Sequence, residues 1–408
     1  MSTAANLANM PVQTASAPTD LLHPIHDGER FARLRLARSQ NVGPRTFFHL
    51  IRRFGSAERA LAVLPDLAAR GGKQDYDICS ADDAQAEIAA GASLGAVMLQ
   101  VGDAKYPRLL SQIDPAPPVV WVLGDTAIFD RRAIAIVGAR NASALGLRTT
   151  RRLAREMAAN SHVIVSGLAR GIDTAAHEAS LNTGTIAVLA GGLDEPYPPE
   201  NLSLADRIAE RGALISEMPF GMKPTSRHFP RRNRLISGLA EGVILVEAAA
   251  RSGSLITARF ALEQGREALA CPGAPEDPRS AGCNQLIREG ASLIRHAGDV
   301  EEALAAPRAR GFAEGGEGFQ FDADLFSEEE MRDDYDALSD FDEDGGVGDD
   351  ALAEQIVNLL GPHPIEIDEV ARQCGVSPSE MSLAILELDL AGRVEILPGG
   401  SIVRTENG

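Results

Sequence analysis

The sequence predicts an α/β protein: an extended Rossmann-like, doubly wound parallel sheet with a helical domain before it and a winged-helix domain after it. The main observation is an alternation between about residues 106 and 306, where short apolar runs are separated by amphipathic stretches such as 144–159. Such alternation is typical of buried parallel strands with helices on both faces. The runs are 133–137, 163–165, 186–190, 214–216, 243–246, 268–271 and 293–294.

A glycine turn after the first run supports the same fold. The stretch AIAIVGARNASALG, residues 133–146, begins like a dinucleotide-binding turn, in which an apolar strand meets a glycine and then a helix. A nicotinamide or flavin protein would continue with two more glycines, but these positions are Arg140 and Ser143. Arg140 would lie where a pyrophosphate normally touches the backbone. We therefore predict an anion site that takes no cofactor.

Domains of different composition are expected on both sides of the sheet. The N-V-G-P turn at 41–44 resembles a helix-hairpin-helix turn, which either contacts nucleic acid weakly or only packs. Near the C-terminus, helical patterns at 351–360, 366–374 and 379–391 precede a hairpin, in the order of a winged helix. The expected domains are a disordered leader (1–26), an N-terminal helical domain that resembles a SAM or helix-hairpin-helix domain (27–102), the Rossmann-like domain (103–308), an acidic disordered linker (309–350) and a winged-helix-like domain (351–408).

The net charge of −19 is concentrated near the C-terminus. Residues 312–350 contain sixteen Asp and Glu against one Arg, a net charge of −15, and residues 351–408 carry a net charge of −6. The first 311 residues therefore have a net charge of +2, which leaves the sheet domain free to bind a polyanion. The acidic linker could compete with that polyanion as a tethered mimic. The acidic winged helix suits a protein-binding or regulatory role.

The cysteines and the N-terminus indicate a cytoplasmic protein. Four cysteines are scattered without a C-x-x-C pair, which disfavours framework disulfides and structural zinc. The first twenty residues lack the charged start and the apolar run of a signal peptide, and no later segment is long enough to span a bilayer. We expect no metal and no membrane partner.

The loops after the predicted strands should meet at one edge of the sheet, where the ligands of doubly wound folds gather. They place glycines and hydroxyl residues at helix starts, where free backbone amides form anion nests. Several nests on one edge favour a ligand with several phosphates. The groups concerned are Gly138, Arg140 and Ser143 after the first run, Ser166, Gly167, Arg170 and Gly171 after the second, and Glu247, Ser252, Gly253 and Ser254 after the fifth.

Two basic segments add positive charge to this edge. Residues 220–240 contain five Lys and Arg and no acid, whereas a solvated face normally interleaves both signs. Four arginines at helical spacing form a stripe on the helix that follows the Arg140 loop, at Arg148, Arg151, Arg152 and Arg155. We favour a polyanion-binding surface over a plain solvated face.

One pair of residues has the spacing of an acid–base pair. Asp173 and His177 lie four residues apart on a predicted helix, where a carboxylate could orient an imidazole. The alternative is a helix cap and an inward-facing histidine. Since no nucleophile, metal cluster or second carboxylate stands at a recognisable spacing, we predict a binding protein that is not an enzyme and has no catalytic residue.

Seven segments resemble, in order, the signature blocks of one family. The segments are YPRLLSQIDPAPPVVWVLGD, IVGARNASALG, SGLARGIDTAAH, TIAVLAGGLDEPYPPEN, FPRRNRLISGLA, VEAAARSGSLITARFALEQGRE and PGAPEDPRSAGCNQLIREGA. By these blocks the chain resembles the DNA-processing protein A family (DprA, also called Smf). The resemblance implies a protein that binds single-stranded DNA and loads the RecA recombinase onto it during natural transformation and recombination. It would displace single-strand-binding protein or work beside it.

The resemblance also implies a binding pocket and a homodimer. The dimer would form through the segment NQLIREGASLI, with Ile287 and Leu293 as apolar candidates, although both residues could equally belong to the core. The pocket residues, with Ser143 of the first loop included, are Gly138, Arg140, Ser143, Ser166, Gly167, Arg170, Gly171, Arg232, Asn233, Arg234, Ser252, Gly253 and Ser254.

A run of phosphodiesters accounts for Arg140. A guanidinium can hold one phosphate bidentately while nest amides hold its neighbour. Four or five such contacts would give a slope of about −3 per protomer in a plot of log affinity against log salt concentration. Phe229 is the aromatic residue between residues 223 and 234, so we predict little base preference.

Two other functions compete with this prediction. The first is a nucleotide-processing enzyme related to Rossmann-like phosphoribohydrolases, whose P-G-G-x-G-T-x-x-E motif ends in a reacting glutamate. The nearest segment, RSGSLITARF, has Phe260 in place of that glutamate, three residues after Thr257, which argues against hydrolysis. The second is a structural hub whose basic groove binds an acidic protein.

Overall fold

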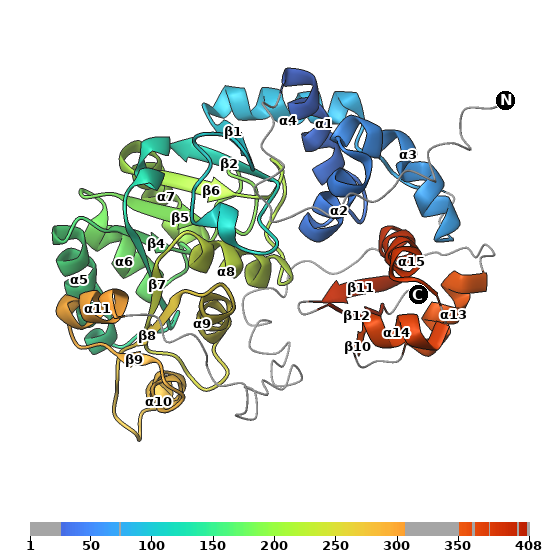
Figure 1. Cartoon of the computed structure of the whole chain (residues 1–408). Coiled ribbons are helices and arrows are strands. Elements are labelled where there is room, and N and C mark those ends of the chain that lie inside the picture. The colour runs from blue at the N-terminus through green and yellow to red at the C-terminus, as the bar shows by residue number, and fades with distance from the viewer. Residues whose placement is uncertain are drawn as a thin grey trace. The chain divides into compact units, whose positions relative to one another are not determined.

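The computed structural model (Figure 1) describes residues 26–72, 75–306, 351–360, 364–374, 376–397 and 400–405. The expected acidic linker and all but the last residue of the expected leader lie outside these ranges. The chain divides into two compact units, one formed by residues 1–86 and 341–408 and the other by residues 87–340. In the described ranges, no helix has the length and apolar character needed to cross a membrane.

The larger unit is built on a sheet with nine strands among the described residues. Strands β3 to β9 are parallel, and β1 and β2 extend the sheet beyond β6 as an antiparallel pair. All seven predicted runs form strands, and β1 and β2 are the two that sequence analysis missed. In spatial order the strands are β1 (Val97–Gln100), β2 (Val119–Gly124), β6 (Ala213–Ser216), β5 (Thr185–Val188), β4 (Val163–Ser166), β3 (Ala133–Gly138), β7 (Gly242–Val246), β8 (Glu267–Ala270) and β9 (Ser292–Leu293).

Helices cover both faces of this sheet, as strands that are apolar throughout require. Side chains of α5, α6 and α11 share one hydrophobic core with β3, β4 and β7, which includes Ile136, Leu153 and Ile172, and α8 and α9 lie on the opposite face (Figure 1). The helices are α5 (Ala144–Ala159), α6 (Ile172–Ser180), α7 (Leu202–Arg211), α8 (His228–Gly238), α9 (Ser254–Glu263), α10 (Ala281–Arg288) and α11 (Ala297–Ala305), with short 3-10 turns at Leu110–Gln112, Thr126–Asp130, Pro199–Asn201 and Pro278–Ser280.

The strand order places a topological switch point between β3 and β7. These two strands pair directly, with Gly138 opposite Val246. From β3 the chain winds outward through β4, β5 and β6, whereas β7 leads in the other direction to β8 and β9. Loops at the carboxyl ends of the strands beside such a point are where doubly wound folds bind ligands.

The smaller unit combines the N-terminal helices with the winged helix. The expected order of elements in the winged helix is confirmed, with a short strand, β10, added before its second helix. The N-terminal helices are α1 (Asp27–Arg38), α2 (Pro44–Phe54), α3 (Ala57–Arg70) and α4 (Ala81–Leu94), the last of which crosses into the larger unit. The winged helix contains α13 (Ala351–Leu359), β10 (Ile365–Glu366), α14 (Ile367–Cys374), α15 (Pro378–Leu390), β11 (Val394–Leu397) and β12 (Ser401–Arg404).

The N-V-G-P turn packs against the end of α15 within this unit. Asn41 donates a hydrogen bond of 2.8 Å to the carbonyl oxygen of Leu390, and the Thr46 hydroxyl donates one of 2.5 Å to Asp389. Leu390 also belongs to the hydrophobic core that contains Phe47. Burial raises the pKa of Asp389 to about 6, although the bond from Thr46 opposes this shift.

Candidate functional site

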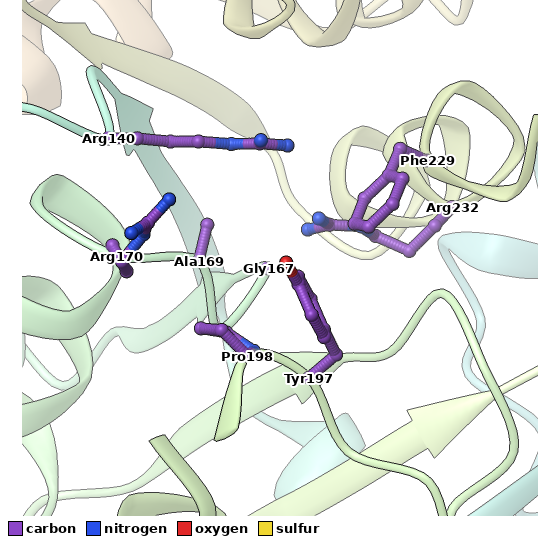
Figure 2. Close-up of a pocket in the computed structure, with 8 residues that line it drawn as sticks. All are labelled: Arg140, Gly167, Ala169, Arg170, Tyr197, Pro198, Phe229 and Arg232. Atoms are coloured by element: carbon purple, nitrogen blue, oxygen red, sulfur yellow. The ribbon is translucent and has the colours of Figure 1, made fainter. Parts of the chain in front are cut away.

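A pocket of about 260 Å³, partly open to solvent, lies where the loops after β3 and β4 meet α8. Figure 2 shows the residues that line it, which are Arg140, Gly167, Ala169, Arg170, Tyr197, Pro198, Phe229 and Arg232.

Three arginines reach this pocket from three different elements. Arg140 comes from the loop after β3, Arg170 from the loop after β4, and Arg232 from α8. Figure 2 shows their side chains entering from different sides. Arg140 and the Arg170 side chain are exposed, and Arg170 lies 4.0 Å from Glu200. The pocket therefore concentrates positive charge that a ligand can reach.

An aromatic ring contacts two of these arginines. The guanidinium carbons of Arg140 and Arg232 lie 5.5 and 5.7 Å from the centroid of the Phe229 ring, within the range of a cation–π contact. Phe229 and Arg232 are three residues apart on α8 and therefore share a face of the helix. Tyr197 meets Phe229 edge to face, with 6.2 Å between ring centroids. The pocket thus combines cations with aromatic surface.

Arg232 is buried, with only 6% of its surface exposed. Its guanidinium packs on the backbone of residue 167, where a β-carbon would lie 1.3 Å from Nη1, so any other residue at this position would displace the guanidinium. Burial, opposed by Asp173 and assisted by Arg140, lowers the pKa of Arg232 to about 10, so the group stays protonated at neutral pH. Among the described residues, its Nε has no hydrogen-bond partner. A buried cation with an open donor is suited to an anionic ligand.

Asp173 supports the loop that carries this pocket. Its carboxylate accepts hydrogen bonds from the amides of Gly167 and Ala169, at 3.1 and 3.3 Å. Burial raises the pKa of Asp173, and the charge of Arg232 and the two amide bonds oppose that shift. Asp173 therefore fixes the backbone on which Arg232 packs.

His177 is bonded away from Asp173. Its Nδ1 lies 2.7 Å from the hydroxyl of Thr185, whose own proton is donated to the carbonyl oxygen of Ile164, so Nδ1 is the donor. Burial, and secondarily the charge of Arg232, lowers the pKa of His177 to about 3. A neutral imidazole bonded to threonine is the inward-facing histidine of the sequence analysis rather than half of an acid–base pair.

The structure brings four predicted site residues into the pocket: Arg140, Gly167, Arg170 and Arg232. Gly171 stands next to them as the N-cap of α6, where a β-carbon would lie 2.4 Å from the carbonyl oxygen of Arg140. Gly171 therefore packs against the backbone of the Arg140 loop, and the close approach leaves no room for a side chain at position 171.

A second group connects α8 to the start of α9 beside the pocket. Asn233 donates a hydrogen bond of 3.3 Å to the carbonyl oxygen of Gly253, the N-cap of α9. The hydroxyls of Ser252 and Ser254 bond to each other at 2.8 Å. This segment adjoins the helix that supplies Phe229 and Arg232, although it does not line the pocket itself.

Other predicted residues are turned toward the protein. Ser166 is buried and donates to the carbonyl oxygen of Ile136 at 2.7 Å. Arg234 donates to the carbonyl oxygen of Pro115 at 2.8 Å and forms an ion pair with Glu217. These side chains stabilise the structure around the pocket and do not line the pocket itself.

Two residues of the first loop, Gly138 and Ser143, also face the protein. Gly138 ends β3 against Val246, and the side chain and amide of Ser143 bind the carboxylate of Glu247. Sequence analysis missed Tyr197 and Pro198, which line the pocket from the loop after β5. The signal that could have found them is an aromatic residue in a loop at the same sheet edge.

The two predicted dimer residues differ in exposure. Leu293 lies on the edge strand β9 and is 43% exposed, whereas Ile287 on α10 is partly buried. Leu293 is therefore no core residue of the unit. Within the described residues, no group of three His, Cys, Asp or Glu is placed to hold a metal ion.

Comparison with known proteins covers all three parts of the chain. Residues 97–305 match the family described as DNA recombination-mediator protein A. Residues 27–90 match the DprA-like N-terminal HHH domain, and residues 344–400 match the DprA winged helix domain.

Individual relatives agree with this assignment. DNA processing protein DprA of Bacillus subtilis (strain 168) is 46% identical over 220 residues, which are 53% of this chain and 74% of that protein. Protein Smf of Escherichia coli (strain K12) is 38% identical over 299 residues, 72% of this chain and 74% of that protein. The X-ray structure of DNA processing protein A from Streptococcus pneumoniae has a TM-score of 0.57 and 33% identity, covering 68% of this chain and 98% of that one. The sheet, its flanking domains and these matches show that the chain belongs to the DNA recombination-mediator protein A family, also named DprA or Smf.

Proposed function

We propose that this protein binds single-stranded DNA at the carboxyl edge of its sheet and loads a RecA-type recombinase onto it. The observation that carries the proposal is the convergence of Arg140, Arg170 and Arg232 on a pocket that also presents Phe229. Guanidinium groups hold phosphodiesters bidentately, and an aromatic ring offers a platform for a base. Membership of a family of recombination mediators supports the context of recombination and transformation.

Single-stranded DNA fits the pocket better than a duplex. In a duplex the faces of the bases are stacked on one another, so only phosphates and base edges are available. A single strand can present a phosphate to an arginine and turn the face of a base toward an aromatic ring. Phe229 and Tyr197 would have no stacking partner on a duplex, whereas phosphate contacts alone would bind both forms.

Binding without catalysis agrees with the chemistry of the site. The candidate base, His177, is hydrogen-bonded to Thr185, and burial lowers its pKa to about 3. Asp173 is engaged by two backbone amides behind the pocket. The position of the reacting glutamate in phosphoribohydrolases is Phe260 here. We therefore propose a binding protein that changes no covalent bond in its ligand.

We also propose a homodimer that works with the recombinase and with single-strand-binding protein. The exposure of Leu293 on the last strand of the sheet supports an interface at this edge. Two protomers would offer two arginine pockets to one strand, so that the second pocket binds at a high effective concentration. Leu293→Arg should shift the protein toward monomer in sedimentation equilibrium while Leu262→Arg, at an exposed leucine of α9, should not.

The direct test of the function is a titration of fluorescent oligo-dT and of a matched duplex at several salt concentrations. Three phosphate contacts predict a slope of log affinity against log salt of about −2 per protomer for the single strand. Loading is tested by following RecA filament formation on DNA already covered with single-strand-binding protein, with and without this protein. Equal affinity for duplex and single strand, or no acceleration of filament formation, would contradict the corresponding half of the proposal.

A further inference from the structure

The switch point of the sheet, where a nucleotide phosphate would be expected, holds a side chain of the protein itself. Glu247 is the residue immediately after β7, beside the end of β3 and the start of α5. In doubly wound folds this crevice takes the phosphates of nucleotides, because the helix that follows the first strand directs its free amides into it. The arginine pocket described above lies beyond this point, on the loops after β3 and β4 and on α8.

The Glu247 carboxylate is bonded to the N-cap residue of α5. The backbone amide of Ser143, the N-cap of α5, donates a hydrogen bond of 2.8 Å to Oε2, and the Ser143 hydroxyl donates to Oε1. The 16-residue helix has no acidic residue in its own first turn. The negative charge that complements its N-terminus therefore comes from the loop after β7.

Two local features keep this carboxylate in place. The backbone of Glu247 has a φ of 55°, a left-handed conformation that residues other than glycine seldom adopt. Residue 146 in the first turn of α5 is a glycine, and a β-carbon there would lie 2.5 to 2.7 Å from the carboxyl atoms of Glu247. A strained backbone conformation and a glycine therefore occur together where the carboxylate meets the helix.

We propose that Glu247 is a specificity-determining residue, a resident anion that excludes free phosphate and mononucleotides from the switch point. The inference rests on the proposed function and deepens it, because it names the ligands that the same sheet edge rejects. A phosphate monoester entering the crevice would have to displace a bonded carboxylate or lie beside it as a like charge. A polynucleotide needs no such entry, since its phosphodiesters can reach the three arginines beyond the crevice.

The test opens the crevice without disturbing the backbone. Glu247→Gly removes the carboxylate and suits the positive φ, so the variant should fold even though two hydrogen bonds from Ser143 are lost. Binding of inorganic phosphate and of AMP is measured by thermal shift and by equilibrium dialysis, against chloride at the same ionic strength. We expect phosphate and AMP to bind Glu247→Gly about tenfold or more tightly than wild type.

A matched control removes a carboxylate from another helix start. Asp299 accepts the backbone amides of Arg295 and His296 at the beginning of α11, away from the switch point. Asp299→Ala should lose stability but show no response to phosphate. The inference is overturned if Glu247→Gly is folded and binds neither phosphate nor AMP more tightly than wild type, or if Asp299→Ala responds equally.

A parallel oligo-dT titration keeps this inference separate from the proposed function. If wild type binds oligo-dT and Glu247→Gly shows no phosphate response, the function stands and the resident-anion role fails. If wild type binds no oligo-dT, the proposed function fails, whatever the phosphate response of the variant. Retention of oligo-dT affinity within about threefold in Glu247→Gly is the expected result, since Glu247 does not line the arginine pocket.

Discussion

Replacement of Arg140 by alanine should weaken single-strand binding without unfolding the protein. The side chain is exposed and reaches the pocket from a loop, so its removal leaves the core intact. A charge-assisted hydrogen bond to phosphate contributes about 1.5–3 kcal/mol. Loss of one such contact raises the dissociation constant for oligo-dT by roughly 10- to 150-fold. The salt slope should also become less steep by about 0.7, the value for one phosphate contact on a single strand.

Fluorescence anisotropy with oligo-dT at four or more salt concentrations measures both quantities in one experiment. Arg207→Ala is the matched control, because Arg207 is an exposed arginine on α7 outside the pocket. Its affinity should stay within about twofold of wild type. An Arg140→Ala variant with wild-type affinity and an unchanged slope would show that the pocket does not hold phosphate.

Four further variants test the pocket and the smaller unit. Phe229→Ala should raise the dissociation constant by the loss of about 1–3 kcal/mol of base stacking but leave the salt slope unchanged, which separates stacking from charge. Arg232→Ala leaves Asp173 buried without its cationic neighbour, so the free energy of unfolding in urea should fall by about 3–5 kcal/mol. Gly167→Ala places a methyl group against the Arg232 guanidinium, and overpacking should lower the free energy of unfolding by about 1–3 kcal/mol and weaken oligo-dT binding. Asp389 has a folded pKa of about 6, above its unfolded value, so its charged form is disfavoured in the folded state. The free energy of unfolding of the smaller unit should therefore rise by up to about 3 kcal/mol as pH falls from 7 through 6 toward 4, and Asp389→Asn should remove this rise.

Most of the parallel part of the fold could be predicted because β3 to β7 are buried and their sequences are nearly all apolar. That pattern indicates burial between two layers of helices. The edge strand β9 departs from it, because Leu293 is 43% exposed. Strands β1 and β2 were missed, although β2 (Val119–Gly124) has the same apolar pattern as the predicted runs. An apolar run gives no direction, so the antiparallel pairing of β2 with β6, about ninety residues further along the chain, could not be predicted from it.

The location of the site could be predicted better than the direction of its side chains. Carboxyl ends of parallel strands meet at one edge, so Arg140 and Arg170 were placed together by topology. The orientation of Ser143 and Arg234 depends on Glu247 and Glu217, which capture them as partners. A sequence pattern identifies hydrogen-bond donors on a loop. Which acceptors they bind depends on the tertiary structure.

The burial of Arg232 affects the conformational entropy that would be lost when this protein binds single-stranded DNA. Its guanidinium is already fixed between Phe229 and the backbone at Gly167 before any ligand arrives, so this cation loses little rotamer freedom on binding. On the proposed function, the loss of conformational freedom on binding would then fall mainly on the single-stranded DNA. Contacts between the DNA and Arg232 should therefore persist on warming better than contacts made by surface cations that rotate freely.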